Sequence, residues 1–222
     1  MSSSNTSDKP CIVAAHIASD FQLTGDASNA AWSKANAVVI SNDTVTGKPI
    51  KELHTTTKAL YTDKYLYMAW ECRYTTLTVF DIGVDTPSRR MGLWEKDVVE
   101  VFIMINEEHP KVYAELEFAP NGEWLDVGVD LQNDLKDFDY STQSEFKIQV
   151  DEDAKIWKVE ARIPVPLKAC GIDGHIPKPC DTWKVNIFRY DGANNRFMAL
   201  NPTFQDPAAF HVPEAFVDLK FE

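Results

Sequence analysis

Short runs rich in β-branched and aromatic residues recur along the chain and constrain its fold more than any other feature. Polar turns separate them, and helical periodicity is nearly absent. The runs span residues 55–62, 66–74, 93–105, 112–119, 123–130, 146–151, 155–163, 182–190, 196–200 and 216–221. Many short strands with few helices are typical of sandwiches and barrels. The pattern predicts an all-β, mainly antiparallel β-sandwich with a jelly-roll or immunoglobulin-like two-sheet architecture.

Two turns indicate which runs pair. Asp63-Lys64 joins the first two runs, and Asn121-Gly122 separates runs 112–119 and 123–130. Asn-Gly favours a two-residue turn in which both residues adopt positive φ. We therefore expect antiparallel hairpins at both places. Helical turns are expected only near residues 27–33 and 166–170.

Length and charge limit the class of protein. A chain of 222 residues commonly forms one domain when it is a sandwich, here expected over residues 11–222 after a disordered lead-in at 1–10. The formal net charge of −12 disfavours nucleic acid as a partner. No apolar run approaches the roughly 20 residues that cross a bilayer, so membrane insertion is not expected. The location stays open: extracellular or periplasmic if a signal was removed, otherwise cytoplasmic.

Four cysteines show no metal-binding spacing. Cys170 and Cys180 flank a loop rich in glycine and proline, where a disulfide and two free thiols are both open alternatives. Cys72 lies within a strand pattern and is expected to be a buried free thiol.

Alternation along the strands points to a polar face. Successive residues of a strand point to opposite sides, so Val99 and Val101 oppose Glu100. In the next two runs, Tyr113, Glu115 and Glu117 oppose Ala114, Leu116 and Phe118, while Trp124 and Asp126 oppose Leu125, Val127 and Val129. We expect one face to be core and the other to collect carboxylates and aromatics, with Trp94 at its edge. Flat rings beside hydrogen-bond acceptors suit a sugar.

Several motifs follow one another between about Asp26 and Phe221. They are ALYTDKYLYMAWEC, LWEKDVVEVFI, YAELEFAPNGEWLDV, WKVEARIP, WKVNIFRYDG, NPT and FHVPEAF, preceded by Trp32. Their order resembles the carbohydrate-binding modules of family 9, within the wider DOMON-like group. The resemblance implies a β-sandwich with structural calcium and a sugar site on one sheet face, where two tryptophans enclose the reducing-end unit of a glycan.

The resemblance also implies roles for particular residues. Trp94 matches one stacking tryptophan, Glu100 matches the acidic hydrogen-bonding residue, and Asn186 and Arg189 match polar positions common in relatives. Leu200 lies near the place where many relatives carry the second tryptophan. Three alternatives are open for that wall: replacement by Phe197, Phe210 or His211, a one-sided site, or loss of sugar binding. The face argument adds Glu117 and Trp124 to the candidate site.

The function expected is non-catalytic binding of a mono- or oligosaccharide that supports polysaccharide breakdown or uptake, with a glycoside hydrolase as a candidate partner. A glycosidase needs two carboxylates placed across the scissile bond. Glu100, Glu115, Glu117 and Asp126 offer candidates, but no catalytic signature accompanies them. We therefore predict a binding protein and not an enzyme.

Two other functions are open. Some DOMON-like relatives hold a b-type haem between a methionine and a histidine, and haem needs an apolar slot with axial ligands. The candidates are Met68, Met91 or Met104 with His175 or His211. The remaining alternative is an interaction domain with no small ligand.

Overall fold

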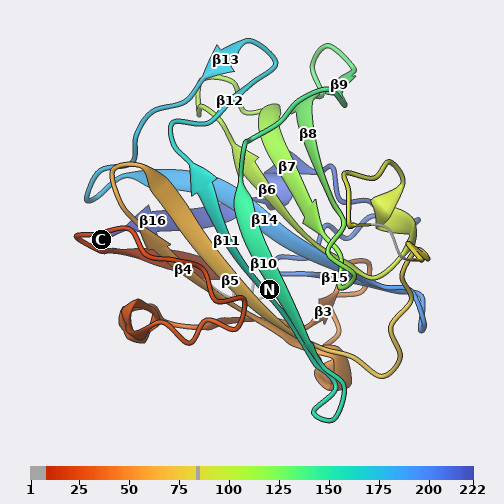
Figure 1. Cartoon of the computed structure of the whole chain (residues 1–222). Coiled ribbons are helices and arrows are strands. Elements are labelled where there is room, and N and C mark those ends of the chain that lie inside the picture. Colours follow the sequence, from red (N-terminus) through yellow and green to blue (C-terminus); the bar gives the residue numbers. More distant parts are fainter. Residues whose placement is uncertain (1–8, 84–85) are drawn as a thin grey trace, which may run out of the picture.

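Sixteen strands and four short 3-10 helices make up the regular structure of the part of the chain that this computed structural model describes, residues 9–83 and 86–222. The strands are β1 (Cys11–His16), β2 (Val38–Ile40), β3 (Asn42–Asp43), β4 (Thr55–Tyr61), β5 (Tyr65–Arg73), β6 (Val98–Met104), β7 (Val112–Phe118), β8 (Trp124–Asp130), β9 (Leu135–Asp137), β10 (Glu145–Asp151), β11 (Ile156–Pro164), β12 (Lys168–Ala169), β13 (Ile172–Asp173), β14 (Thr182–Asp191), β15 (Arg196–Ala199) and β16 (Val217–Phe221). The 3-10 helices are η1 (Ala30–Lys34), η2 (Lys51–Leu53), η3 (Leu93–Glu95) and η4 (Pro213–Ala215). The predicted all-β class is confirmed (Figure 1). Most of the predicted lead-in, residues 1–8, lies outside the described residues.

One continuous sheet curls over on itself to make the two layers. Its strand order is β10-β11-β5-β4-β1-β16-β14-β6-β7-β8-β9, and β12 and β13 form a separate pair. The core between the layers combines Trp70 and Trp157 from one half with Val101 and Leu116 from the other. The layers are joined through β1, which runs parallel to both β4 and β16. The predicted sandwich is confirmed, but this parallel strand was not expected from the sequence.

Both predicted hairpins form. At Asp63-Lys64, the backbone N–H of Thr62 donates to the carbonyl of Tyr65 over 2.9 Å. The expected turn type between β7 and β8 is wrong. The N–H of Gly122 donates to the carbonyl of Ala119, and Gly122 alone of the Asn-Gly pair has positive φ, at +90°. The turn is therefore centred one residue earlier, and Gly122 supplies the left-handed residue that follows it.

Several local expectations are corrected. The run 93–105 is not strand throughout, because η3 precedes β6. The helical turn expected at 166–170 is replaced by β12, whereas the one expected at 27–33 is present as η1. Cys72 is buried as expected, and none of the cysteines in the described ranges forms a disulfide. No helix in those ranges is long and apolar enough to cross a lipid bilayer.

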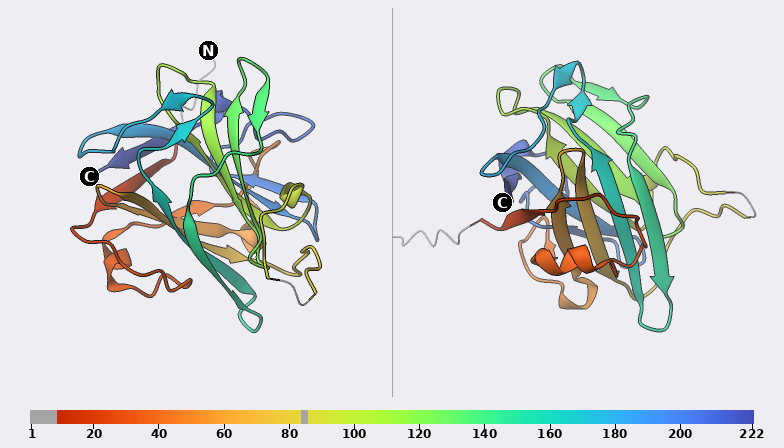
Figure 2. Two further views of the ribbon diagram at one scale, coloured as in Figure 1. Left: turned by 45° about the horizontal axis from the view of Figure 1, so that its top comes forward. Right: turned by 60° about the vertical axis from the view of Figure 1, so that its left-hand side comes forward.

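Additional apolar layers cover the outside of both halves of the sheet. On one half, the N-terminal segment runs across the outside of the sheet (Figure 2, right). It packs Ile17, Leu23 and Trp32 against Leu60 and Tyr67. On the other half, loops lie over β6, β7 and β8. Every residue of β6 and β7 is consequently buried. Because these strands are packed on both faces, they form a rigid floor for the cavity described below.

A buried carboxylate fastens the N-terminal segment to β11. Glu160 Oε2 accepts from the backbone N–H groups of Thr24 (2.5 Å) and Gly25 (2.6 Å), and also from the Thr24 hydroxyl. Glu160 Oε1 accepts from Trp32 Nε1 at 2.7 Å. Four donors thus converge on one side chain that is fully shielded from solvent.

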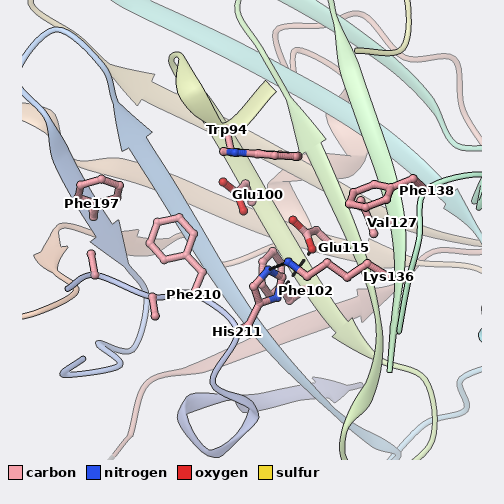
Figure 3. Close-up of a pocket in the computed structure, with 12 residues that line it drawn as sticks. Trp94, Glu100, Phe102, Glu115, Val127, Lys136, Phe138, Phe197, Phe210 and His211 are labelled. Carbon is pink, nitrogen blue, oxygen red and sulfur yellow. Dashed lines mark hydrogen bonds and ion pairs between the residues drawn. The ribbon is translucent and has the colours of Figure 1, made fainter. Parts of the chain in front are cut away.

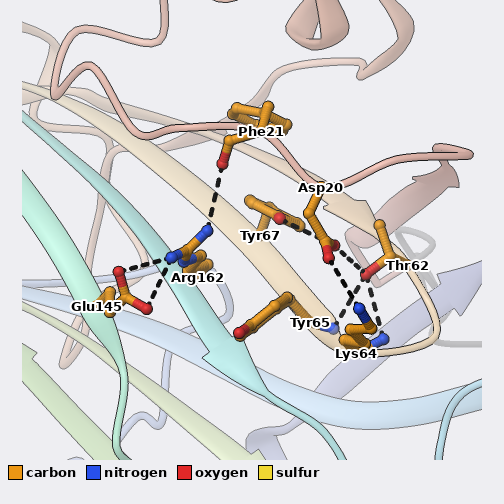
Figure 4. A network of polar contacts seen from close by, with 8 residues as sticks. All are labelled: Asp20, Phe21, Thr62, Lys64, Tyr65, Tyr67, Glu145 and Arg162. Atoms are coloured by element: carbon orange, nitrogen blue, oxygen red, sulfur yellow. Dashed lines mark hydrogen bonds and ion pairs between the residues drawn. The ribbon is translucent and has the colours of Figure 1, made fainter.

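A second network, nearer the surface, holds the start of the same segment (Figure 4). Asp20 Oδ1 accepts from the hydroxyls of Thr62 (2.9 Å) and Tyr67 (3.2 Å). Arg162 donates to the carbonyl of Phe21 and pairs with both carboxylate oxygens of Glu145 at 2.7 Å. The segment is therefore held by polar contacts on both β5 and β11.

Candidate functional site

A cavity of about 400 Å³ opens on the outer face of β6, β7 and β8. It lies within the size range of small-molecule sites. Figure 3 shows the residues that line it, which come from strands and loops far apart in sequence. They are Trp94, Glu100, Phe102, Glu115, Val127, Lys136, Phe138, Phe197, Ala208, Ala209, Phe210 and His211.

Three neighbouring strands supply the floor. Phe102 on β6 lies directly opposite Glu115 on β7, and Glu115 lies opposite Val127 on β8. Glu100 lies two residues before Phe102 and so points to the same side. Because these strands are buried on both faces, the floor is fixed by packing on both sides.

Aromatic rings form the walls. Trp94 in η3 is 41% exposed, which is high for a tryptophan in this fold. Phe210 stacks on Phe188 with ring centroids 4.3 Å apart, and Phe197 meets Phe210 edge-on at 6.1 Å. Figure 3 places Trp94 and Phe138 around the opening, across from these two phenylalanines. The cavity therefore offers several apolar surfaces around a polar floor.

Two buried carboxylates hold the segment that carries Trp94. Asp97 Oδ2 accepts from both the backbone N–H and the hydroxyl of Thr78 at 2.7 Å. Glu123 Oε1 accepts from Arg90 Nε at 2.6 Å. Both acidic side chains are fully shielded from solvent. Trp94 thus lies on a segment fastened on either side, which fixes the position of its ring.

The floor concentrates negative charge. Glu100 lies directly opposite Glu117, and Glu115 lies on the same face of β7. Burial raises the pKa of Glu115 to about 7 and the pKa of both other glutamates well above the ordinary value. The repulsion between neighbouring carboxylates raises the pKa of Glu100 and Glu117 further. Some of these groups therefore keep protons at neutral pH.

His211 is held neutral at the far end of the floor. Its Nε2 lies 2.9 Å from Lys136 Nζ, and its Nδ1 lies 2.6 Å from the hydroxyl of Tyr113. A lysine ammonium has no acceptor, so Nε2 accepts and Nδ1 carries the proton. Burial, aided by Lys136, lowers the pKa of His211 to about 4. The ring is therefore a poor general acid near neutral pH.

Glu115 should make stability depend on pH. Its pKa of about 7 lies above the ordinary value of 4.5, so the native state keeps a proton that the unfolded chain loses between these values. The free energy of unfolding then falls as pH rises through this interval. We expect the wild type to lose stability relative to Glu115→Gln between about pH 5 and pH 8, measured by urea unfolding at each pH. A difference that stays constant over that interval would contradict the raised pKa.

The structure brings three of the six predicted site residues together. Trp94 and Glu100 line the cavity. Glu117 lies beside Glu100 at the same level of the sheet but is fully buried and does not line the cavity. Among the alternatives for the second wall, Phe197, Phe210 and His211 all line it.

The other three predicted residues lie elsewhere. Asn186 is fully buried, and its Nδ2 donates to the carbonyls of Asn201 (2.9 Å) and Ala215 (3.3 Å), so it holds loops together. Arg189 is also fully buried and points to the inner face of β14. Its Nη1 donates to the carbonyl of Leu53 and to the Thr55 hydroxyl.

Trp124 was assigned to the wrong face of β8. It lies opposite Phe118, which belongs to the inner core, and it packs on Phe146 with ring centroids 5.4 Å apart. Asp126 shares that inner side and accepts from the backbone and hydroxyl of Thr142. Alternation alone gave the correct grouping within β8 but not which group faces inward.

Leu200 does not border the cavity either. It is 2% exposed and belongs to the inner core. A tryptophan there would overfill a packed interior and would not add a wall to the cavity. We expect Leu200→Trp to lower the free energy of unfolding by about 1–3 kcal/mol, measured by urea unfolding, and not to strengthen binding. Tighter saccharide binding by this variant at unchanged stability would contradict the placement.

The described residues contain no group of three or more His, Cys, Asp or Glu side chains arranged to hold a metal ion. Calcium also takes backbone and amide oxygens, so structural calcium stays a prediction. The candidate haem histidines are engaged with other groups: His211 as above, and His175 Nε2 accepts from Trp183 Nε1 at 3.2 Å. Nothing in the cavity favours the haem alternative.

Comparison with known proteins gives related folds. A candidate carbohydrate-binding protein from Bacteroides uniformis has a TM-score of 0.73 at 14% identity, with 96% of this chain and 99% of that chain covered. A family 9 carbohydrate-binding module from Caldicellulosiruptor kristjanssonii in complex with cellotriose has a TM-score of 0.64 at 13% identity, covering 96% and 94%. A structure of a family 9 module from the same organism in complex with glucose has a TM-score of 0.62 at 14% identity, with 96% of each chain covered. No curated protein matches this sequence.

A family model extends the comparison to the sequence itself. The model for the carbohydrate family 9 binding domain-like family matches residues 23–210. That span includes every residue of the cavity floor and all but one of the residues that line the cavity, His211 being the next residue along. The chain therefore belongs to the carbohydrate family 9 binding domain-like family.

Proposed function

We propose that the chain binds a mono- or oligosaccharide, without transforming it, in the cavity walled by Trp94. One observation carries the proposal: an exposed tryptophan ring lies beside buried carboxylates whose oxygens face the same cavity. The C–H face of a sugar packs on such a ring while its hydroxyls donate to the carboxylates. Solved relatives in complex with cellotriose and glucose add support.

The arrangement of carboxylates argues against hydrolysis. A glycosidase places its two carboxyl groups on opposite sides of the scissile bond. Here Glu100, Glu115 and Glu117 lie side by side in adjacent positions of one floor. Asp126 points to the other face of the sheet. Carboxyl groups side by side on one floor do not face each other across a bound sugar, so binding without catalysis is better supported.

A saccharide-binding domain of this kind would serve to hold another activity near its polysaccharide. The cavity has the volume for a short oligosaccharide or for the end of a longer chain, not for a long stretch of it. We propose that this other activity belongs to a glycoside hydrolase or an uptake system.

The proposal is tested by isothermal titration calorimetry of the protein with cellotriose, glucose and the open-chain polyol sorbitol. We expect saturable binding of at least one of the two saccharides and none of sorbitol, because only a ring presents a flat C–H face to Trp94. Heats that do not saturate with any saccharide of a broader glycan panel would refute saccharide binding.

A further inference from the structure

The floor of the cavity holds more acidic groups than its neighbouring cations could balance as carboxylates. Glu100, Glu115 and Glu117 share one face of β6 and β7, and each is at most 6% exposed. Among the described cations, Lys136 is the one whose charge lowers the pKa of all three glutamates. His211 beside it stays neutral. Tyr113, which completes this set of titratable groups, has its pKa raised and is also neutral.

The balancing charge lies at one end only. Lys136 Nζ is bound to His211 Nε2, and in Figure 3 this ammonium lies near Glu115. Glu100 lies at the other end, beneath the ring of Trp94. No cation of the described residues pairs with Glu100 there.

Glu100 also lacks donors. It lines the cavity, is 2% exposed, and its Oε1 has no hydrogen-bond partner among the described residues. Both carboxyl oxygens of Glu117 behind it are likewise without a hydrogen-bond partner among the described residues. A buried carboxylate without donors or a counter-charge is costly in free energy. In the absence of a ligand, these glutamates therefore hold protons.

We propose that the preferred ligands of this cavity are saccharides with a protonated amine, of the glucosamine type. The inference rests on the proposed saccharide function and specifies its ligand class. An ammonium brings three donors and one positive charge. It donates to the Glu100 carboxyl and gives the floor its second cation, while the face of Trp94 attracts the same charge.

An ammonium fits this end of the cavity better than a metal ion does. The carboxylates and the histidine of the described residues are not grouped so that three of them reach one ion. An ammonium needs no such convergence, because its three donors point in different directions and Glu100 alone satisfies one of them. The remaining donors face the open side of the cavity.

Two trisaccharides with the same β-1,4 linkage test the inference: cellotriose, and its counterpart made of three glucosamine units. They differ in a hydroxyl against an amine at each ring. At about pH 6.5, below the pKa of roughly 8 typical of an amine next to a polar group, we expect the glucosamine trimer to bind at least tenfold more tightly. Its fully N-acetylated form, which is neutral, should bind no better than cellotriose.

Proton release provides a second readout. Because the empty floor holds protons in place of a cation, an incoming ammonium expels them, whereas cellotriose does not. The binding heat of the glucosamine trimer should therefore vary with the ionisation enthalpy of the buffer. Glu100→Gln should bring the two trisaccharides to similar affinity, whereas the matched control Glu152→Gln, at an exposed position of the β10–β11 turn, should leave the preference intact.

The outcomes separate the two claims. If both trisaccharides bind the wild type with similar affinity, the amine preference is refuted and the saccharide function stands. If neither binds, the amine preference is refuted, and the broader glycan panel decides the saccharide function. A preference that persists in folded Glu100→Gln also overturns the inference, and if that variant does not fold, the N-acetylated trimer and the buffer dependence decide it on the wild type.

Discussion

Replacing Trp94 with alanine is expected to weaken saccharide binding by about 2 kcal/mol or more, roughly thirtyfold in Kd, with little effect on stability. The ring is 41% exposed and forms a wall of the cavity, so its removal takes away the largest flat surface offered to a sugar. Its segment stays fastened through Asp97 and Glu123. Calorimetric titration with the tightest-binding saccharide, together with a melting curve, measures both effects.

Two further variants make the result specific. Trp94→Phe keeps an aromatic ring and should recover part of the affinity. Phe204→Ala removes an aromatic ring that is 64% exposed but lies outside the cavity, so it should bind like the wild type. Equal loss in Trp94→Ala and Phe204→Ala, or no loss in either, would remove Trp94 from the site.

Replacing Glu160 with alanine is expected to lower the free energy of unfolding by about 3 kcal/mol or more, because several buried donors lose their acceptor at once. The backbone N–H groups of Thr24 and Gly25 and the indole N–H of Trp32 all donate to this carboxylate. Each unpaired buried donor carries a desolvation penalty. Urea unfolding followed by tryptophan fluorescence gives the size of the loss.

The matched control is Glu152→Ala, which deletes the same side chain at an exposed position nearby in sequence. It should change stability by no more than about 0.5 kcal/mol. Limited proteolysis provides a local readout, since cleavage within residues 20–34 should accelerate only in Glu160→Ala. Resistance of that segment in a destabilised Glu160→Ala protein would mean that the carboxylate does not hold it.

Strand positions were predictable because their signals are local. β-branched and aromatic runs and the turn residues at Asp63 and Gly122 mark where strands start and stop, without reference to the rest of the fold. The outward assignment of Trp124 failed for a non-local reason. Loops cover the outer side of β6, β7 and β8, so Leu125 and Val127 are buried there while Trp124 is packed inside. When both faces of a strand are apolar, alternation separates two groups without saying which one is the core.

The site was predictable in part for similar reasons. Trp94 follows Gly92 in a stretch without strand pattern, and Glu100 interrupts an apolar strand, so both stand out in the sequence. Lys136 lies on a three-residue edge strand, where no pattern marks it. Arg189 was assigned to the site only because it matches a polar position common in relatives. In this chain the interior accommodates its side chain through the carbonyl of Leu53 and the hydroxyl of Thr55.

The place of β1 has a consequence for how the protein is made. The first strand lies between β4 and β16, the last strand, with Cys11 opposite Asp218. The sheet therefore cannot close until residues 217–221 have left the ribosome, and contacts between segments so distant in sequence form slowly. Until then an unfinished chain leaves β1 and β14 with unpaired edges, which are templates for aggregation. Production of this fold should accordingly depend more on holding nascent chains apart than on the stability of the finished molecule.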